Sequence, residues 1–152
     1  MRRVKLSDDK GRHDIIEHSY TKLSRLKAAL RSTKSHKASG PDQIKPIVLK
    51  QLSDSVLRHM VRLYDTALTL EYTPVTWRKS NVTMLPKPGK SDYQNPKSFR
   101  PITLSNHLLK LLEKLALWDI TETALKANPL SSKQHGFRND RSTESAALEV
   151  VN

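Results

Sequence analysis

The sequence contains no cysteine and few aromatic residues. It therefore has no disulfide bond, no thiolate zinc site and no cysteine nucleophile, and it suits a reducing compartment, nuclear or cytoplasmic. Aromatic residues make up 5% of the 152 residues and hydrophobic residues 36%. We therefore expect one domain with a modest core.

A long apolar run is also missing. The most apolar segment, residues 108–118, is interrupted by Lys110, Glu113 and Lys114. Residues 1–9 lack the apolar stretch of a signal peptide. We expect no membrane span, no membrane partner and no secretion.

Clustered metal ligands are absent from the sequence pattern as well. The histidines do not recur at ligand spacing; they are His13, His18, His36, His59, His107 and His135. The only adjacent acidic pair, Asp8 and Asp9, lies in a charged lead rather than at a strand turn. We expect neither a metal site nor a catalytic residue.

Positive charge is abundant. The chain has 27 Lys plus Arg against 15 Asp plus Glu, a formal net charge of +12 and a pI near 10.1. A solvated cationic surface is the simplest interpretation of any one lysine. An imbalance this large favours a polyanionic partner, and nucleic acid is the first candidate.

Hydrophobic periodicity predicts a mostly helical chain. We interpret residues 1–20 as a flexible lead, with at most a marginal helix over residues 14–18. Leucines at helical spacing predict an amphipathic helix from Thr21 to about residue 32, and then two helices over residues 42–70, broken near Ser53. A long helix from Asn106 to about Lys126 and a final helix from about Ser142 follow. Trp77 and Phe137 are expected to pack in the core.

Two strands interrupt the helices. Residues 82–85 and 99–104 have strand character, and the segment between them contains three prolines and a glycine. Prolines and glycine disfavour both helix and strand, so we expect no regular structure in this segment. The two strands should therefore form a hairpin with a mobile basic tip. The fold class is therefore α+β, mostly helical, with a small antiparallel hairpin.

Lys87 and Arg100 stand at the edges of these strands, so the hairpin would bring the two cations to one end of the sheet. Arginine offers a rigid fork to phosphate oxygens and lysine a compact charge. Together they predict a clamp for a triphosphate. The alternative is that both are ordinary solvent-facing residues at strand ends.

Two further basic segments could hold a sugar-phosphate backbone. Lys34 and Lys37 lie in a loop between two helices, where backbone amides could assist. Arg138 and Arg141 precede the last helix, and solvated arginines at a helix entry are an equally good interpretation of that pair. Asp42 is expected to cap the next helix, and either Asp140 or Ser142 the last one.

Three segments share their order and spacing with a known family. They are KASGPD at residues 37–42, LPKPGK at 85–90 followed by SFRPI at 98–102, and QHGFR at 134–138 followed by Ser142 and Thr143. From about Thr21 to Ala147 the chain resembles the amino-terminal part of a reverse transcriptase from a jockey-type non-LTR retrotransposon. The loop departs from the family pattern at Ser39 and Gln43, and His135 stands where a phenylalanine is common.

The resemblance implies that residues 21–152 form the fingers and the start of the palm of a right-hand polymerase fold. It implies that Lys87 and Arg100 grip the incoming dNTP, and that the loop with Lys37 contacts template RNA. In this family the metal-binding aspartates lie further along, so Mg²⁺ is a cofactor of the full-length enzyme and none is expected in this segment. We expect RNA, DNA, dNTP and the remainder of the polymerase as partners, and no activity from this chain alone.

A second interpretation stays open. The chain could be a domesticated, non-enzymatic basic helical module that binds nucleic acid or a protein partner. Salt-sensitive binding would separate nucleic acid from a protein partner.

Overall fold

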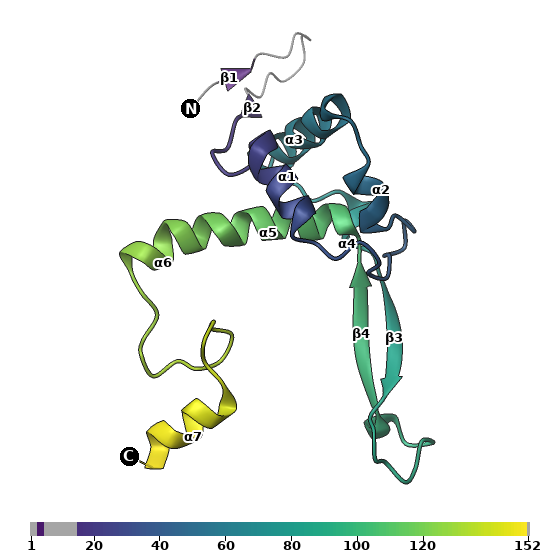
Figure 1. The fold of residues 1–152 in the computed structure, drawn as a ribbon. Helices are drawn as coiled ribbons and strands as arrows, with labels where there is room; N and C mark the ends of the chain where they lie inside the picture. Colours follow the sequence, from purple (N-terminus) through teal and green to yellow (C-terminus); the bar gives the residue numbers. More distant parts are fainter. Residues whose placement is uncertain (1–2, 5–14, 152) are drawn as a thin grey trace. The chain divides into compact units, whose positions relative to one another are not determined.

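A computed structural model describes residues 3–4 and 15–151 of the chain (Figure 1). The expected flexible lead, residues 1–20, lies largely outside this range. The described strands are β1 (Arg3–Val4), β2 (Ile15–Ile16), β3 (Ser80–Pro86) and β4 (Phe99–Ser105). The helices are α1 (Leu23–Arg31), α2 (Pro46–Lys50), α3 (Asp54–Thr69), α4 (Val75–Arg78), η1 (Pro96–Ser98), α5 (His107–Glu122), α6 (Ala124–Ala127) and α7 (Thr143–Val151).

The chain divides into two compact units, residues 1–117 and residues 118–152. About half of it is helical, and the longer sheet is an antiparallel pair, which confirms the α+β expectation. None of the described helices is long and apolar enough to cross a membrane.

The core of the first unit is built by one face of each of its longer helices. Tyr64 of α3 is fully buried, packs edge to face on Trp77 with ring centroids 5.8 Å apart, and donates a hydrogen bond to the Leu108 carbonyl at 2.8 Å. This contact ties α3 to the first turn of α5. Trp77 is 5% exposed, which confirms its expected place in the core. The aliphatic core residues are Leu26, Ala29, Leu30, Leu49, Leu57, Met60, Leu111 and Leu115.

A buried carboxylate fixes the chain that enters α1. Asp65 of α3 is 3% exposed and accepts hydrogen bonds from the Thr21 hydroxyl and from the His18 backbone amide. Just before this point Ile15 and Ile16 pair with Val4 and Arg3 in a short antiparallel ladder. The marginal helix expected over residues 14–18 is therefore wrong for the described residues, because this backbone is extended.

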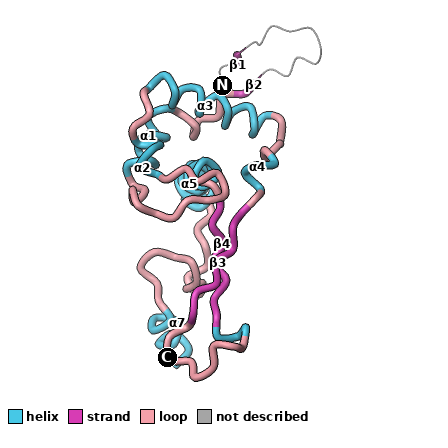
Figure 2. The backbone as a smooth tube through the Cα atoms, turned by 90° about the vertical axis from the view of Figure 1, so that its right-hand side faces the viewer, coloured by secondary structure: helices cyan, strands magenta, loops and turns pink. Residues whose placement is uncertain are grey.

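Strands β3 and β4 form the expected hairpin, in register from Ser80 opposite Ser105 to Pro86 opposite Phe99. Within its unit the hairpin extends away from the helices as a two-stranded arm (Figure 2). Every residue of β3 is exposed. The arm therefore holds together mainly through its own ladder.

The hairpin tip has more structure than the sequence suggests. Asn95 caps the single turn η1 through its side chain, which accepts a hydrogen bond from the Lys97 amide at 2.9 Å. The Tyr93 ring packs edge to face on Phe99, and its hydroxyl donates to the Lys87 carbonyl at 2.9 Å. The expectation of no regular structure here is wrong, because Pro96 starts a 3-10 turn with its fixed backbone angle.

The second unit contains the end of α5, then α6 and α7. The expected single helix to about Lys126 is interrupted at Thr123, whose backbone (φ −111°, ψ −76°) departs from helical values, and Asn128 ends α6. Ser142 caps α7, because its hydroxyl oxygen accepts the Ser145 amide hydrogen at 3.1 Å. Of the two expected caps, Ser142 is confirmed.

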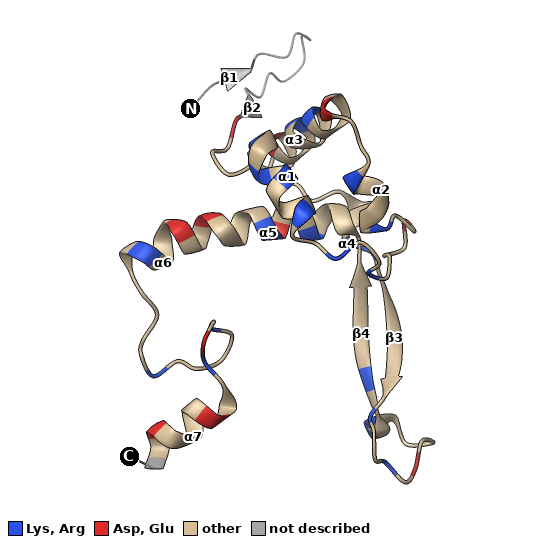
Figure 3. Cartoon of the chain, in the orientation of Figure 1, with Lys and Arg blue, Asp and Glu red and all other residues tan. Residues whose placement is uncertain are grey.

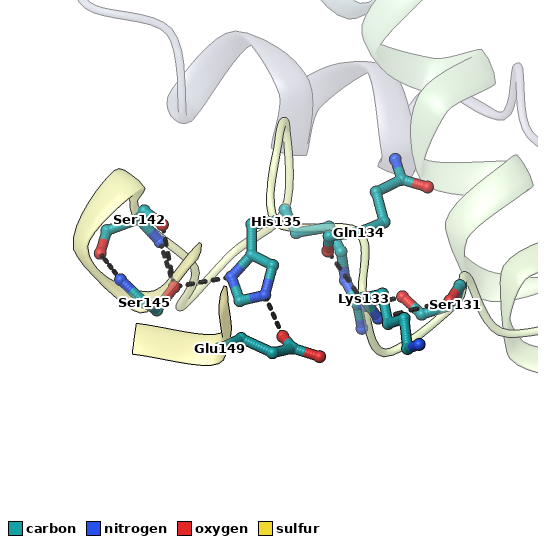
Figure 4. Close-up of polar contacts among 8 residues, drawn as sticks. Ser131, Lys133, Gln134, His135, Ser142, Ser145 and Glu149 are labelled. Atoms are coloured by element: carbon teal, nitrogen blue, oxygen red, sulfur yellow. Dashed lines mark hydrogen bonds and ion pairs between the residues drawn. The ribbon is translucent and has the colours of Figure 1, made fainter. Parts of the chain in front are cut away.

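The loop before α7 is held by one histidine. His135 contacts the Ser145 hydroxyl at 2.8 Å through Nδ1 and the Glu149 carboxylate through Nε2 (Figure 4). Phe137 in the same loop is fully exposed and has a φ of 58°. Its expected role as a core anchor is therefore wrong: a left-handed backbone at this position turns the ring toward solvent.

Candidate phosphate and nucleic-acid interface

The hairpin register places Lys87 and Arg100 on the same face. Arg100 lies opposite Leu85, and side chains two residues apart along a strand share a face. Lys87 continues the ladder, because its amide donates to the Ser98 carbonyl at 2.8 Å. The two cations are therefore diagonal neighbours, which in an antiparallel pair lie about 7–8 Å apart at their Cα atoms.

The environments of these two cations differ. Arg100 is exposed, whereas Lys87 is partly buried and donates one hydrogen bond from its ammonium to the Lys97 carbonyl at 2.8 Å. An ammonium has three N–H donors, so two remain for a ligand. A fixed lysine beside an accessible arginine can bind adjacent phosphate groups.

The loop of residues 37–42 is seated on the junction between β4 and α5. A Cβ atom on Gly40 would lie 2.5 Å from Asn106 Oδ1 and 2.7 Å from the Asn106 amide nitrogen. Only glycine allows the backbone to approach this closely. Lys34 and Lys37 precede this fixed point by six and three residues and are exposed to solvent.

Asp42 does not cap α2. That helix begins at Pro46, with Lys45 at the cap position, and Asp42 Oδ1 instead accepts the Ile44 amide hydrogen at 3.1 Å. This is an Asx turn, in which the aspartate mimics a backbone turn two residues on. The expected cap is wrong because Asp42 lies too far ahead of the proline that starts the helix.

Sequence reasoning missed two lysines near this loop. Lys110 and Lys114 stand one turn apart on α5, and Lys114 is partly buried. Burial lowers the pKa of Lys114, and the nearby Lys37 lowers it further. The signal was the spacing: Lys110 follows His107 by three residues and Lys114 follows Lys110 by four, which puts all three side chains on one helical face.

His107 links the loop to α5. It is 2% exposed, and its Nε2 donates to the Ala38 carbonyl at 3.0 Å, since a carbonyl can only accept. Burial lowers the pKa of His107, and the positive charges of Lys110 and Lys37 add to this effect. The Ala38 hydrogen bond and the Asp42 carboxylate oppose it.

Arg138 and Arg141 occupy different settings in the second unit. Arg138 donates from Nη1 to the Ser131 carbonyl at 2.8 Å and to the Gln134 carbonyl at 3.4 Å, so it closes its own loop. Arg141 is exposed. Arg138 is therefore partly engaged within its own loop, whereas Arg141 is more exposed.

Positively charged side chains occur on several elements of the chain. Lys and Arg occur at the far end of the hairpin and on α1, α2 and α3 (Figure 3). Within residues 3–4 and 15–151, no group of three or more His, Asp or Glu side chains could hold a metal ion. The described part of the chain thus offers cations for phosphate and no cage for Mg²⁺.

No protein-family model matches the chain. It is 29% identical over 122 residues to a probable RNA-directed DNA polymerase from transposon BS of Drosophila melanogaster, a match that covers 80% of this chain and 13% of that protein. It is 29% identical over 130 residues to the RNA-directed DNA polymerase from mobile element jockey of Drosophila funebris, covering 86% of this chain and 14% of the relative. The polymerase of the X-element of Drosophila melanogaster matches at 29% over 117 residues, 77% of this chain and 13% of that protein.

These matches confirm the resemblance inferred from the three motifs. The chain spans 13% to 14% of the length of these relatives, so it corresponds to one segment of each. Over most of its length, this chain is similar to a segment of the RNA-directed DNA polymerases of jockey-like non-LTR retrotransposons.

Proposed function

We propose that this chain serves as the fingers and the start of the palm of a reverse transcriptase, over residues 21–152. Its part in DNA synthesis is to position the incoming dNTP and the template rather than to carry out the bond-forming step. The observation that supports this most strongly is the diagonal placement of Lys87 and Arg100 on one face of the hairpin, in a chain similar to RNA-directed DNA polymerases.

In this proposal Arg100 and Lys87 bind the triphosphate of the dNTP. The arginine contributes a two-pronged contact and the lysine a charge held in place by the Lys97 carbonyl. Lys34, Lys37, Arg138 and Arg141 contact the backbone of template or primer. RNA and DNA are therefore the macromolecular partners, and the remainder of a polymerase is the protein partner.

Polymerases of this kind use Mg²⁺ for phosphoryl transfer. The described residues do not fit such a site, because they contain no cluster of carboxylates. We therefore propose that this chain contributes no catalytic residue.

The test is binding of a fluorescent dNTP, labelled on its sugar, to the full 152-residue chain. Arg100→Gln should weaken binding about tenfold, since a hydrogen bond to a charged group contributes about 1.5–3 kcal/mol. Lys87→Gln should act in the same direction, and unlabelled tripolyphosphate should displace the nucleotide.

Arg78→Gln is the matched control. Arg78 is exposed at the end of α4, two residues before the first residue of β3 and so at the opposite end of the hairpin from Arg100, and it carries the same charge. If it weakens dNTP binding as much as Arg100→Gln, the effect is one of overall charge and the clamp does not exist.

A further inference from the structure

A cavity of about 370 Å³ lies in the first unit among α1, α2 and α5. Its floor is aliphatic and buried, and consists of Leu30, Pro46, Leu49 and Leu111. None of its lining residues is Phe, Tyr or Trp. The imidazole of His107 also lines the cavity but is only 2% exposed, so the cavity can enclose an apolar group while presenting it almost no aromatic surface to stack on.

The rim of this cavity is cationic. Lys37, Lys110 and Lys114 line it, and Glu113 is the one acidic residue that does so. Like charges one helical turn apart, as on α5, destabilise a helix slightly. Burial is the main cause of the lowered pKa of Lys114, and the charge of the nearby Lys37 lowers it further, so these two positive charges repel one another. An anion at the rim would relieve that repulsion.

The size of the cavity limits what can bind. Pockets for small organic ligands range from about 300 to 1,000 Å³, so this one suits a single compact group rather than the length of a partner helix. The ligand must therefore combine a compact body that can lie on leucines with at least one negative charge.

We propose that the cavity accepts one nucleotide of a bound single strand, with the base on the aliphatic floor and its phosphate among Lys37, Lys110 and Lys114. This inference rests on the proposed function, because Lys37 belongs to the loop assigned to the template. A nucleotide combines a compact base that can lie on leucines with a negatively charged phosphate. The net charge of +12 also favours a polyanionic partner. Lys110 and Lys114 thereby join the template-contacting residues.

The aliphatic floor gives the proposal a distinctive signature. Single-strand sites with aromatic platforms keep the base stacked. Here the base must leave the stack of its neighbours and lie mainly against leucine and proline side chains. The fluorescence of 2-aminopurine, which stacking quenches, should therefore increase on binding.

The experiment uses the full chain and two single-stranded RNA probes of equal length. One carries 2-aminopurine at its centre, and the other carries abasic units at its central positions, so that both have the same phosphates. The abasic probe should bind several-fold more weakly, because the floor loses its apolar partner. The 2-aminopurine signal should rise with the bound fraction.

Matched variants assign these effects to the cavity. Lys110→Gln with Lys114→Gln should reduce the slope of log affinity against log salt by about 0.7 per lost phosphate contact. Lys126→Gln, an exposed lysine of α6, is the control for charge. Leu117→Glu at the cavity edge should abolish the 2-aminopurine increase, whereas Leu148→Glu on α7 should not; these leucines are 58% and 65% exposed, so both variants should fold.

The outcomes are distinguishable. Equal affinity for both probes, or an unchanged salt slope in the double lysine variant, overturns the cavity assignment and leaves RNA binding intact. Failure of both probes to bind overturns this inference and the template-binding part of the proposed function together. If Lys110→Gln with Lys114→Gln weakens binding of an oligoglutamate peptide but leaves RNA binding unchanged, the cavity is a site for acidic protein segments and the proposal is overturned.

Discussion

At the scale of single residues, His107 has an environment that makes a pH prediction possible. Its pKa is below the usual value of 6.5, chiefly because the ring is buried. As pH falls below that value, the unfolded chain takes up a proton that the folded chain resists, so acid favours unfolding. The stability that neutral His107 contributes is therefore present above the unfolded pKa and is lost as pH falls toward the folded pKa.

We expect His107→Gln to flatten the decline of the unfolding free energy between about pH 8 and about pH 5. Urea unfolding across this range is the measurement. His59→Gln, on the exposed face of α3, is the matched control and should keep the profile of the unsubstituted chain. A His107→Gln profile as steep as the original would mean that other groups cause the decline.

Residues also show where prediction from sequence stops. Lys87 and Arg100 could be paired from the sequence, because two short strands joined by a proline-rich turn allow one simple arrangement. Phe137 could not be placed, since hydrophobicity alone does not say what covers a ring, and it is fully exposed. In the sequence Lys110 and Lys114 only interrupt an apolar segment. The structure places them at the same cavity as Lys37, a proximity that helical spacing alone does not predict.

At the scale of elements, the contact between residues 37–42 and the start of α5 carries the main structural prediction. Gly40→Ala would force a Cβ atom to within 2.8 Å of backbone atoms of Ser105 and Asn106, which cannot rotate away. Overpacking of this kind costs about 1–3 kcal/mol. Thermal or urea unfolding should show this loss of stability.

Gly136→Ala is the matched control. No heavy atom lies within 4 Å of the position its Cβ would take. Its effect should stay within about 0.5 kcal/mol, as for most surface substitutions. Equal stability of the two alanine variants would contradict the seating of the loop on α5.

The helices and strands were easier to predict from the sequence than the local turns and caps. Leucine spacing of three and four residues located α1, α3 and α5, and the hairpin followed from apolar segments bounded by prolines. Local chemistry was less predictable: Asp42 forms a turn rather than a cap, and Thr123 breaks a helix whose hydrophobic pattern continues. Both depend on backbone angles that hydrophobic periodicity does not encode.

At the scale of the whole molecule, the excess of positive charge unites the proposed contacts. Cations occur at the clamp on the hairpin, in the loop with Lys37 and at the exposed Arg141. The described residues contain no cluster of carboxylates that could hold a metal ion. Cations of this kind should bind nucleic-acid backbones with little sequence preference, because phosphate contacts carry no base information.

We propose that this chain contacts the nucleic-acid backbone through Lys34, Lys37, Arg138 and Arg141. The most direct measurement is the affinity of the chain for a labelled single-stranded RNA, by fluorescence anisotropy, across a series of salt concentrations. Each phosphate contact to a single strand contributes about −0.7 to the slope of log affinity against log salt, so these four residues should contribute about −3 to the slope, and the slope should become shallower by that amount when they are changed to glutamine. An affinity that stays flat from low to moderate salt would contradict the account.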